Sequence, residues 1–185
     1  DVYKRQILGD SKAILNYVIK STKTGDGLRI YAGMGLTVPS KSVLTSDPFS
    51  LRDSGQQTKH RHFSLSNGTY NSISELQIFY KRNINPVFIG GFITFERPIK
   101  ASQYGYLPST LTSLSISASF MNYDQKESSI DYGFSLLHSS KAFWNDKYAP
   151  NSESLTALPS LGYLFNSRFG VISINLQTVS YTHLR

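Results

Sequence analysis

A strictly alternating stretch at residues 111–123 constrains the fold of this chain more than any other feature. Serines fill the odd positions from 113 to 119, and apolar residues fill the even positions from 114 to 120, namely Leu114, Ile116, Ala118 and Phe120. Because successive side chains of a β-strand point to opposite faces, this pattern predicts a strand with one apolar and one small polar face. Such a strand fits a sheet with its apolar face inward, or a membrane barrel with that face toward lipid.

The composition favours β structure and leaves strands as the only route across a membrane. Charged residues make up just 17% of the 185 residues, and no window approaches 18 consecutive apolar residues. A transmembrane helix is therefore excluded. A barrel is not, because the hydropathy of alternating strands averages out.

The absence of cysteine removes disulfides, zinc–thiolate sites and cysteine nucleophiles. The net charge of +7 comes from scattered basic residues that form no stripe, so we expect no nucleic-acid partner.

Eight segments carry the pattern of a strand, and the connections between them are alternately short and long. Outer-membrane barrels have this alternation, because their periplasmic turns are short and their outer loops are long. Aromatic residues such as Tyr80, Phe88 and Phe120 flank the short turns, as in an interfacial girdle, although aromatics are common in strands generally. The expected strands are residues 13–21, 28–38, 72–82, 87–97, 111–123, 129–138, 155–165 and 169–177.

We therefore expect an all-β, antiparallel, up-and-down transmembrane β-barrel, with about eight strands present. Gly90 and Gly91 suggest a bulge or a close backbone approach, and Pro159 removes one hydrogen-bond donor from its strand. Residues 1–6 and 179–185 resemble translated sequencing adapters, so we expect non-native ends around one partial barrel domain at residues 7–178. The first and last strands would both have their free ends on the long-loop side, which predicts a fragment of a larger barrel.

Four short motifs, in the right order, resemble a family of bacterial outer-membrane barrels, the transporter or phenol-degradation meta-pathway barrel family. Residues 33–39 are similar to its strand ending in a Leu-Pro-Thr-Gly type of motif. Residues 66–71 are similar to its Gly-Thr-Gly-Ser/Thr-aromatic-Asp segment, although Asn67 stands where the family often has Gly and Asn71 where it usually has Asp. Gly105 and Tyr106 match a loop Gly-Tyr, and residues 158–163 match its Ser-Pro-Gly-Leu-Ser-Tyr strand. The resemblance, which covers residues 28–177, implies a channel or transport role in the bacterial outer membrane.

Polar residues on the expected strands are candidates to line the lumen of such a barrel. Rings of charge set ion preference in pores, and the mixed signs here argue against strong selectivity. Alternatively, several of them lie at the membrane rim, where charge costs little. The candidates are Arg29, Glu75, Gln77, Lys81, Glu96, Arg97, Asp131 and Asn175.

Metal binding and catalysis have weak support. His60 and His62 alternate, but two ligands do not make a site. His138 and Asp131 supply residue types of a serine hydrolase, yet the sequence has no Gly-x-Ser-x-Gly motif. We expect neither an enzyme nor a cofactor.

Two classes of function remain. The first is an outer-membrane channel whose partners are the lipid bilayer and a small, hydrophobic or aromatic solute. The alternative is a soluble or surface-exposed β-sandwich or barrel that binds a ligand or mediates adhesion. They differ in which strand face is exposed, because soluble proteins rarely expose a large apolar patch. Neither the solute nor the oligomeric state follows from the sequence.

Overall fold

The computed structural model describes residues 9–22, 25–43, 45, 66–83, 87–121, 128–168 and 170–183. The regular elements in these ranges are all β-strands. The described residues contain no helix that is long and apolar enough to cross a membrane.

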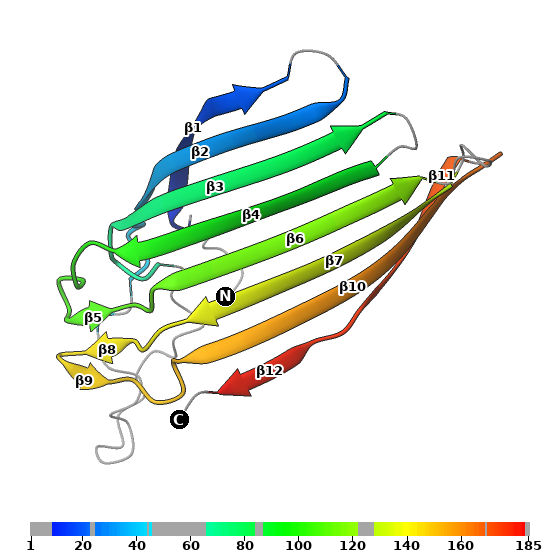
Figure 1. The fold of residues 1–185 in the computed structure, drawn as a ribbon. Coiled ribbons are helices and arrows are strands. Elements are labelled where there is room, and N and C mark those ends of the chain that lie inside the picture. Colours follow the sequence, from blue (N-terminus) through cyan, green and yellow to red (C-terminus); the bar gives the residue numbers. More distant parts are fainter. Residues whose placement is uncertain are drawn as a thin grey trace.

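One nine-stranded antiparallel sheet makes up most of the protein (Figure 1). Its order follows the chain, so each long strand pairs with the long strands before and after it, and the expected up-and-down arrangement is confirmed. All eight expected strands are present, with bounds within a few residues of those predicted. The strands are β1 (Ser11–Ser21), β2 (Gly27–Val38), β3 (Asn71–Arg82), β4 (Val87–Pro98), β6 (Leu111–Met121), β7 (Ser128–Ser139), β10 (Ser154–Ser167), β11 (Gly170–Gln177) and β12 (Ser180–His183).

The sheet is curved but open. Its curvature brings Lys12 of β1 within 2.6 Å of Glu96 of β4, although β2 and β3 lie between these strands. In the described residues, no pairing joins β1 to β11 or β12. The closed barrel that the alternation of strands suggested is therefore not what the described chain forms, because a sheet closes only when its first and last strands pair.

The strands β11 and β12 are two halves of one strand interrupted opposite a proline. Ser160 faces Gln177 on β11, and Ala157 faces Ser180 on β12, so the register with β10 is unbroken. Between them, the Thr178 amide donates to the Pro159 carbonyl (3.1 Å), but Pro159 has no amide hydrogen to donate in return. The interruption is the physical consequence of that missing donor. Residues 180–183, which we expected to belong to a non-native end, thus form a strand. This pairing does not test whether that end is native.

Gly90 and Gly91 lie in a regular strand, because β4 keeps continuous register with both β3 and β6. The close neighbour of Gly90 is a side chain and not another backbone: a Cβ on Gly90 would lie 2.7 Å from the Phe79 ring, so the glycine makes room for that ring. The bulge occurs instead in β1, between Val18 and Lys20.

Strand ends that short connections join lie at one end of the sheet, and those that long connections join lie at the other. The first end, called the turn end, is where residues 22–26, 83–86, 122–127 and 168–169 link the strands; the second, called the loop end, is where residues 39–70, 99–110 and 140–153 link them. The predicted alternation is confirmed.

A second, three-stranded sheet at the loop end was not predicted. It consists of β5 (Tyr106–Leu107), β8 (Phe143–Trp144) and β9 (Lys147–Tyr148). Tyr106 and Trp144 bury their rings against each other with centroids 5.2 Å apart, and Ala142 and Ala149 complete this small core. Two of the long connections, 99–110 and 140–153, therefore share a small sheet of their own (Figure 1).

Candidate functional site

The main sheet has one apolar and one polar face, and the register fixes which residue lies on which. Directly paired residues share a face. Ile116 pairs with Gly91 on one side and Phe134 on the other, and the same face continues across every strand. We call this the apolar face. Its side chains are exposed, for example Met34 (74%), Ile116 (50%) and Ile174 (56%), so none of the described residues forms a layer over it.

Charge on the apolar face is confined to the strand ends. Among the described strand residues, its Lys, Arg, Asp and Glu side chains are Lys20, Arg82 and Arg97, each at the last or next-to-last residue of its strand. Between these ends the face carries no such charge. A 12-residue strand such as β4, rising about 3.3 Å per residue and tilted by about 40°, spans about 28 Å along the membrane normal. Its charge-free part on the apolar face, Val87–Phe95, has nine residues, which matches the about 9–11 residues with which a tilted β-strand spans a bilayer.

The opposite face, called the polar face, is concave and rich in small and hydroxyl residues. The four serines of β6, at positions 113, 115, 117 and 119, all lie on it. Its charged side chains in the described strands are three cations and three carboxylates, so the signs balance. They are Lys12, Arg29, Lys81, Glu75, Glu96 and Asp131.

Seven of the eight candidate lumen residues share the polar face. They are Arg29, Glu75, Gln77, Lys81, Glu96, Asp131 and Asn175. Arg97 lies on the apolar face instead, because it directly follows Glu96 and neighbours in a strand point to opposite sides. His60 and His62 lie outside the described residues. His138 and Asp131 point to opposite faces of β7 and do not converge on one site. In the part of the chain that the structure describes, no three His, Asp or Glu side chains gather in a metal-binding arrangement.

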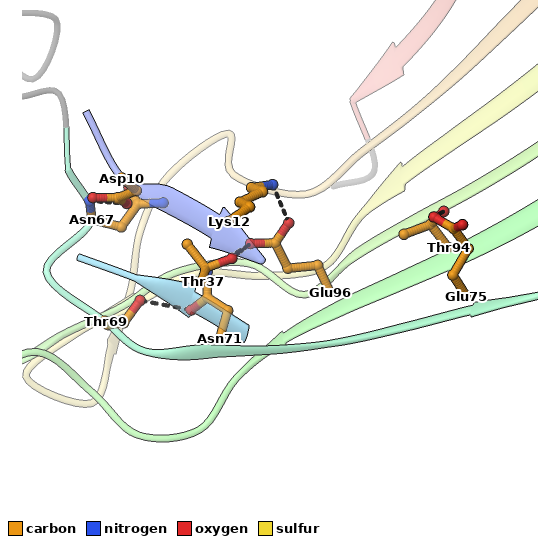
Figure 2. Close-up of polar contacts among 9 residues, drawn as sticks. All are labelled: Asp10, Lys12, Thr37, Asn67, Thr69, Asn71, Glu75, Thr94 and Glu96. Carbon is orange, nitrogen blue, oxygen red and sulfur yellow. Dashed lines mark hydrogen bonds and ion pairs between the residues drawn. The ribbon is translucent and has the colours of Figure 1, made fainter. Parts of the chain in front are cut away.

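Glu96 is the centre of a buried polar cluster near the loop end (Figure 2). Its Oε1 accepts hydrogen bonds from Thr37 Oγ1 (2.9 Å) and Asn71 Nδ2 (2.8 Å), and its Oε2 accepts one from Lys12 Nζ (2.6 Å). Thr69 Oγ1 in turn donates to Asn71 Oδ1 (2.8 Å). The cluster thus draws on β1, β2, β3 and β4 and holds their loop ends together.

The members of this cluster differ in burial. Thr37 is 1% exposed and Asn71 6%, whereas the Lys12 side chain is 52% exposed. Every polar atom named in the cluster has a partner, as buried groups require. Because Lys12 approaches from the solvent side, water and salt screen its attraction to Glu96. The two buried hydrogen bonds, from Thr37 and Asn71, are screened less.

Four members of this cluster were missed as candidate site residues: Lys12, Thr37, Asn71 and Thr69, which belongs to the same 66–71 motif as Asn71. Lys12 falls one residue before the strand expected at 13–21, and it lies 84 positions from Glu96. Thr37 looked like an ordinary strand residue. Asn71 belongs to the motif at residues 66–71, which was the available signal; the motif did not reveal that its amide would donate to Glu96.

Further along the polar face, glycines make room for neighbouring polar side chains. Gly33 lies between Asn16 and Glu75: a Cβ there would be 2.4 Å from Asn16 Oδ1. Gly162 likewise lies between Asn175 and Asp131, and a Cβ there would be 2.4 Å from Asn175 Oδ1. A larger residue at either glycine would displace the polar side chains that cover it.

A hollow of about 430 Å³ lies on the polar face near the Glu96 cluster. Its lining draws on β1, β4, β6, β7 and β10 and includes Lys12, Glu96 and Thr156 together with Leu111 and Leu137. One ion pair, several hydroxyls and two leucines make this surface suited to a small solute that is polar in part and apolar in part.

An aromatic strip lies on the same face toward the turn end. Phe79 stacks on Phe88 with centroids 5.7 Å apart and meets Tyr31 edge-on at 6.2 Å. Phe88 is 39% exposed, and Phe92 of the same strand and face is 41% exposed. The concave face therefore offers both polar and aromatic surfaces.

No protein-family model matches the sequence, and a search of curated proteins found no match.

Proposed function

We propose that this chain forms part of the wall of a bacterial outer-membrane β-barrel through which small solutes pass. The observation that carries the proposal is the exposed apolar face, which is free of charge except at the strand ends. Water-soluble proteins rarely leave so large a patch uncovered, whereas a barrel turns such a face toward lipid. The concave polar face is then the lumen, and the long connections face outward.

The lumen surface indicates what would pass. Equal numbers of cations and carboxylates give little basis for selecting ions by sign. The strip of Tyr31, Phe79 and Phe88 favours transient contact with apolar or aromatic solutes, and the serines of β6 favour weak hydrogen bonding. A small solute, hydrophobic or aromatic in part, suits these surfaces.

Closure is a requirement of the proposal. In lipid, every backbone polar group needs a partner, so open sheet edges are not tolerated. In the membrane, β1 and the β11–β12 strand would therefore pair with each other or with further strands.

The test is refolding from urea with and without detergent micelles, followed by circular dichroism and by heat-modifiable mobility on gels. We expect β structure only with micelles, and release of entrapped small aromatic solutes from vesicles that contain the folded chain. A monodisperse β protein in the absence of detergent would overturn the proposal. It would favour the ligand-binding or adhesion protein, with another layer covering the apolar face.

A further inference from the structure

A second hollow, of about 580 Å³, lies at the loop end beside the apolar face. Arg97 of its lining is on that face. Thr110 and Ser140, also in the lining, lie opposite each other just beyond the β6–β7 pairing: the Ser140 amide donates to the Thr110 carbonyl (3.0 Å), and the Thr110 amide donates to Ser140 Oγ (2.9 Å). The alternation of the two strands places both on the same side as Arg97. Arg97 therefore opens the hollow toward the convex side of the sheet, and residues of the connections 99–110 and 140–153 complete its lining at the loop end.

The lining of this hollow is basic. Arg97, Lys100 and Lys141 contribute three cations, and Asp146 contributes one carboxylate. Lys141 also lies 3.7 Å from Glu153 and over the Tyr148 ring, so we assign the main role to Arg97 and Lys100. Both are exposed, at the end of β4 and just beyond it. A guanidinium group suits phosphate because its planar fork can donate two parallel hydrogen bonds.

Apolar surface adjoins these cations. Ile99, between Arg97 and Lys100, is 60% exposed, and Phe95, next toward the turn end on the apolar face, is 42% exposed. The arrangement is amphiphilic: cations at the loop end, with exposed hydrocarbon directly beside them along the sheet. A ligand with an anionic group attached to acyl chains complements both parts.

We propose that this hollow binds the phosphate of a phosphorylated lipid in the outer leaflet, for which a phosphorylated glycolipid serves as the probe. The inference rests on the proposed function, which directs the loop end outward and sets Arg97 at the level of the lipid headgroups. Basic side chains cost little at that level, and they attract anionic headgroups. A free phosphate ion offers the same anionic chemistry but no acyl chains, so the two occupants can be told apart.

The experiment measures binding of a phosphorylated glycolipid and of its dephosphorylated analogue to the chain refolded in micelles, by native mass spectrometry. The test variant is the double substitution Arg97→Gln and Lys100→Gln. The matched control is Lys20→Gln and Arg82→Gln, which removes one lysine and one arginine from the same face at the turn end. We expect the wild type to prefer the phosphorylated lipid by about tenfold, which corresponds to about 1.4 kcal/mol. The test variant should lose that preference, and the control should keep it.

The inference would be overturned if the wild type, the test variant and the control showed the same preference for the phosphorylated over the dephosphorylated lipid. Displacement of the lipid by millimolar inorganic phosphate would assign the site to a free anion, and would overturn it as well. Gel mobility is followed in the same samples. If the chain folds in micelles but ignores the phosphate, this inference alone fails; if it folds without micelles, the proposed function fails.

Discussion

Placing an arginine at the middle of the apolar face should destabilise the protein sharply, and only there. Ile116 is the central residue of β6, 50% exposed, between Gly91 and Phe134 on the paired strands. If this face contacts lipid, Ile116→Arg places a cation near the bilayer midplane, which costs about 2–4 kcal/mol. In water, the same change at a half-exposed position would cost well under about 1 kcal/mol.

Two further arginine substitutions on β6 test how the cost depends on depth in the bilayer and on the face of the sheet. Thr112 shares the face of Ile116 but lies near the loop end, where an arginine costs only about 0–1 kcal/mol. Ser117 lies on the polar face, which the proposal turns toward the watery lumen, so the guanidinium of Ser117→Arg stays hydrated and the change should cost less than about 1 kcal/mol.

The assay is urea unfolding of each variant refolded in phospholipid vesicles, followed by circular dichroism, with free energies compared at equal vesicle concentration. We expect Ile116→Arg to lower the free energy of unfolding most, and Thr112→Arg and Ser117→Arg to lower it only slightly. Equal effects at Ile116 and Thr112, or a larger effect at Ser117, would refute this expectation.

Three further predictions concern local contacts. Glu96→Leu leaves buried hydrogen-bond donors unpaired and should lower the free energy of unfolding by about 1–3 kcal/mol per donor. Lys12→Met removes a half-exposed partner and should lower it by less than about 1 kcal/mol in the same urea assay. Similar losses in the two variants would contradict the assigned burial. Gly105→Ala, at a φ of +82° and against Asn145, should loosen the small loop sheet, shift the emission of Trp144 to the red and leave gel mobility unchanged; unchanged emission would show that the loop tolerates a Cβ. Pro159→Ala restores a donor to β10 and should slow amide exchange in the β11–β12 strand; faster exchange would count against the account of the interruption.

The strands were predictable because their signal is local. Alternation over about ten residues fixes a strand and its two faces, and the alternating connection lengths fix the up-and-down order. Neighbours such as Leu114 and Ser115 therefore lie on the faces expected for them. The same rule would have moved Arg97 out of the lumen set, because it cannot share a face with Glu96.

The Glu96 cluster and the loop sheet were not predictable, for two different reasons. The cluster depends on the curvature of the whole sheet, which brings Lys12 across two strands to Glu96, and no local pattern encodes that distance. The strands β5, β8 and β9 have two residues each, too short for any period to appear. Their order comes from burial of Tyr106 and Trp144 and from the hydrogen bonds of Ser102 to the Tyr104 and Tyr106 amides.

The most direct test of the central claim is a single-cysteine scan along β6, which the absence of native cysteine makes clean. Each variant, refolded in vesicles, is labelled with a fluorophore and exposed to a lipid-phase and a water-phase quencher. Cysteines at positions 114, 116 and 118 should be quenched from the lipid, and those at 113, 115 and 117 from water. The opposite alternation, or labels at 114, 116 and 118 that neither quencher reaches, would contradict the assignment of the apolar face to lipid.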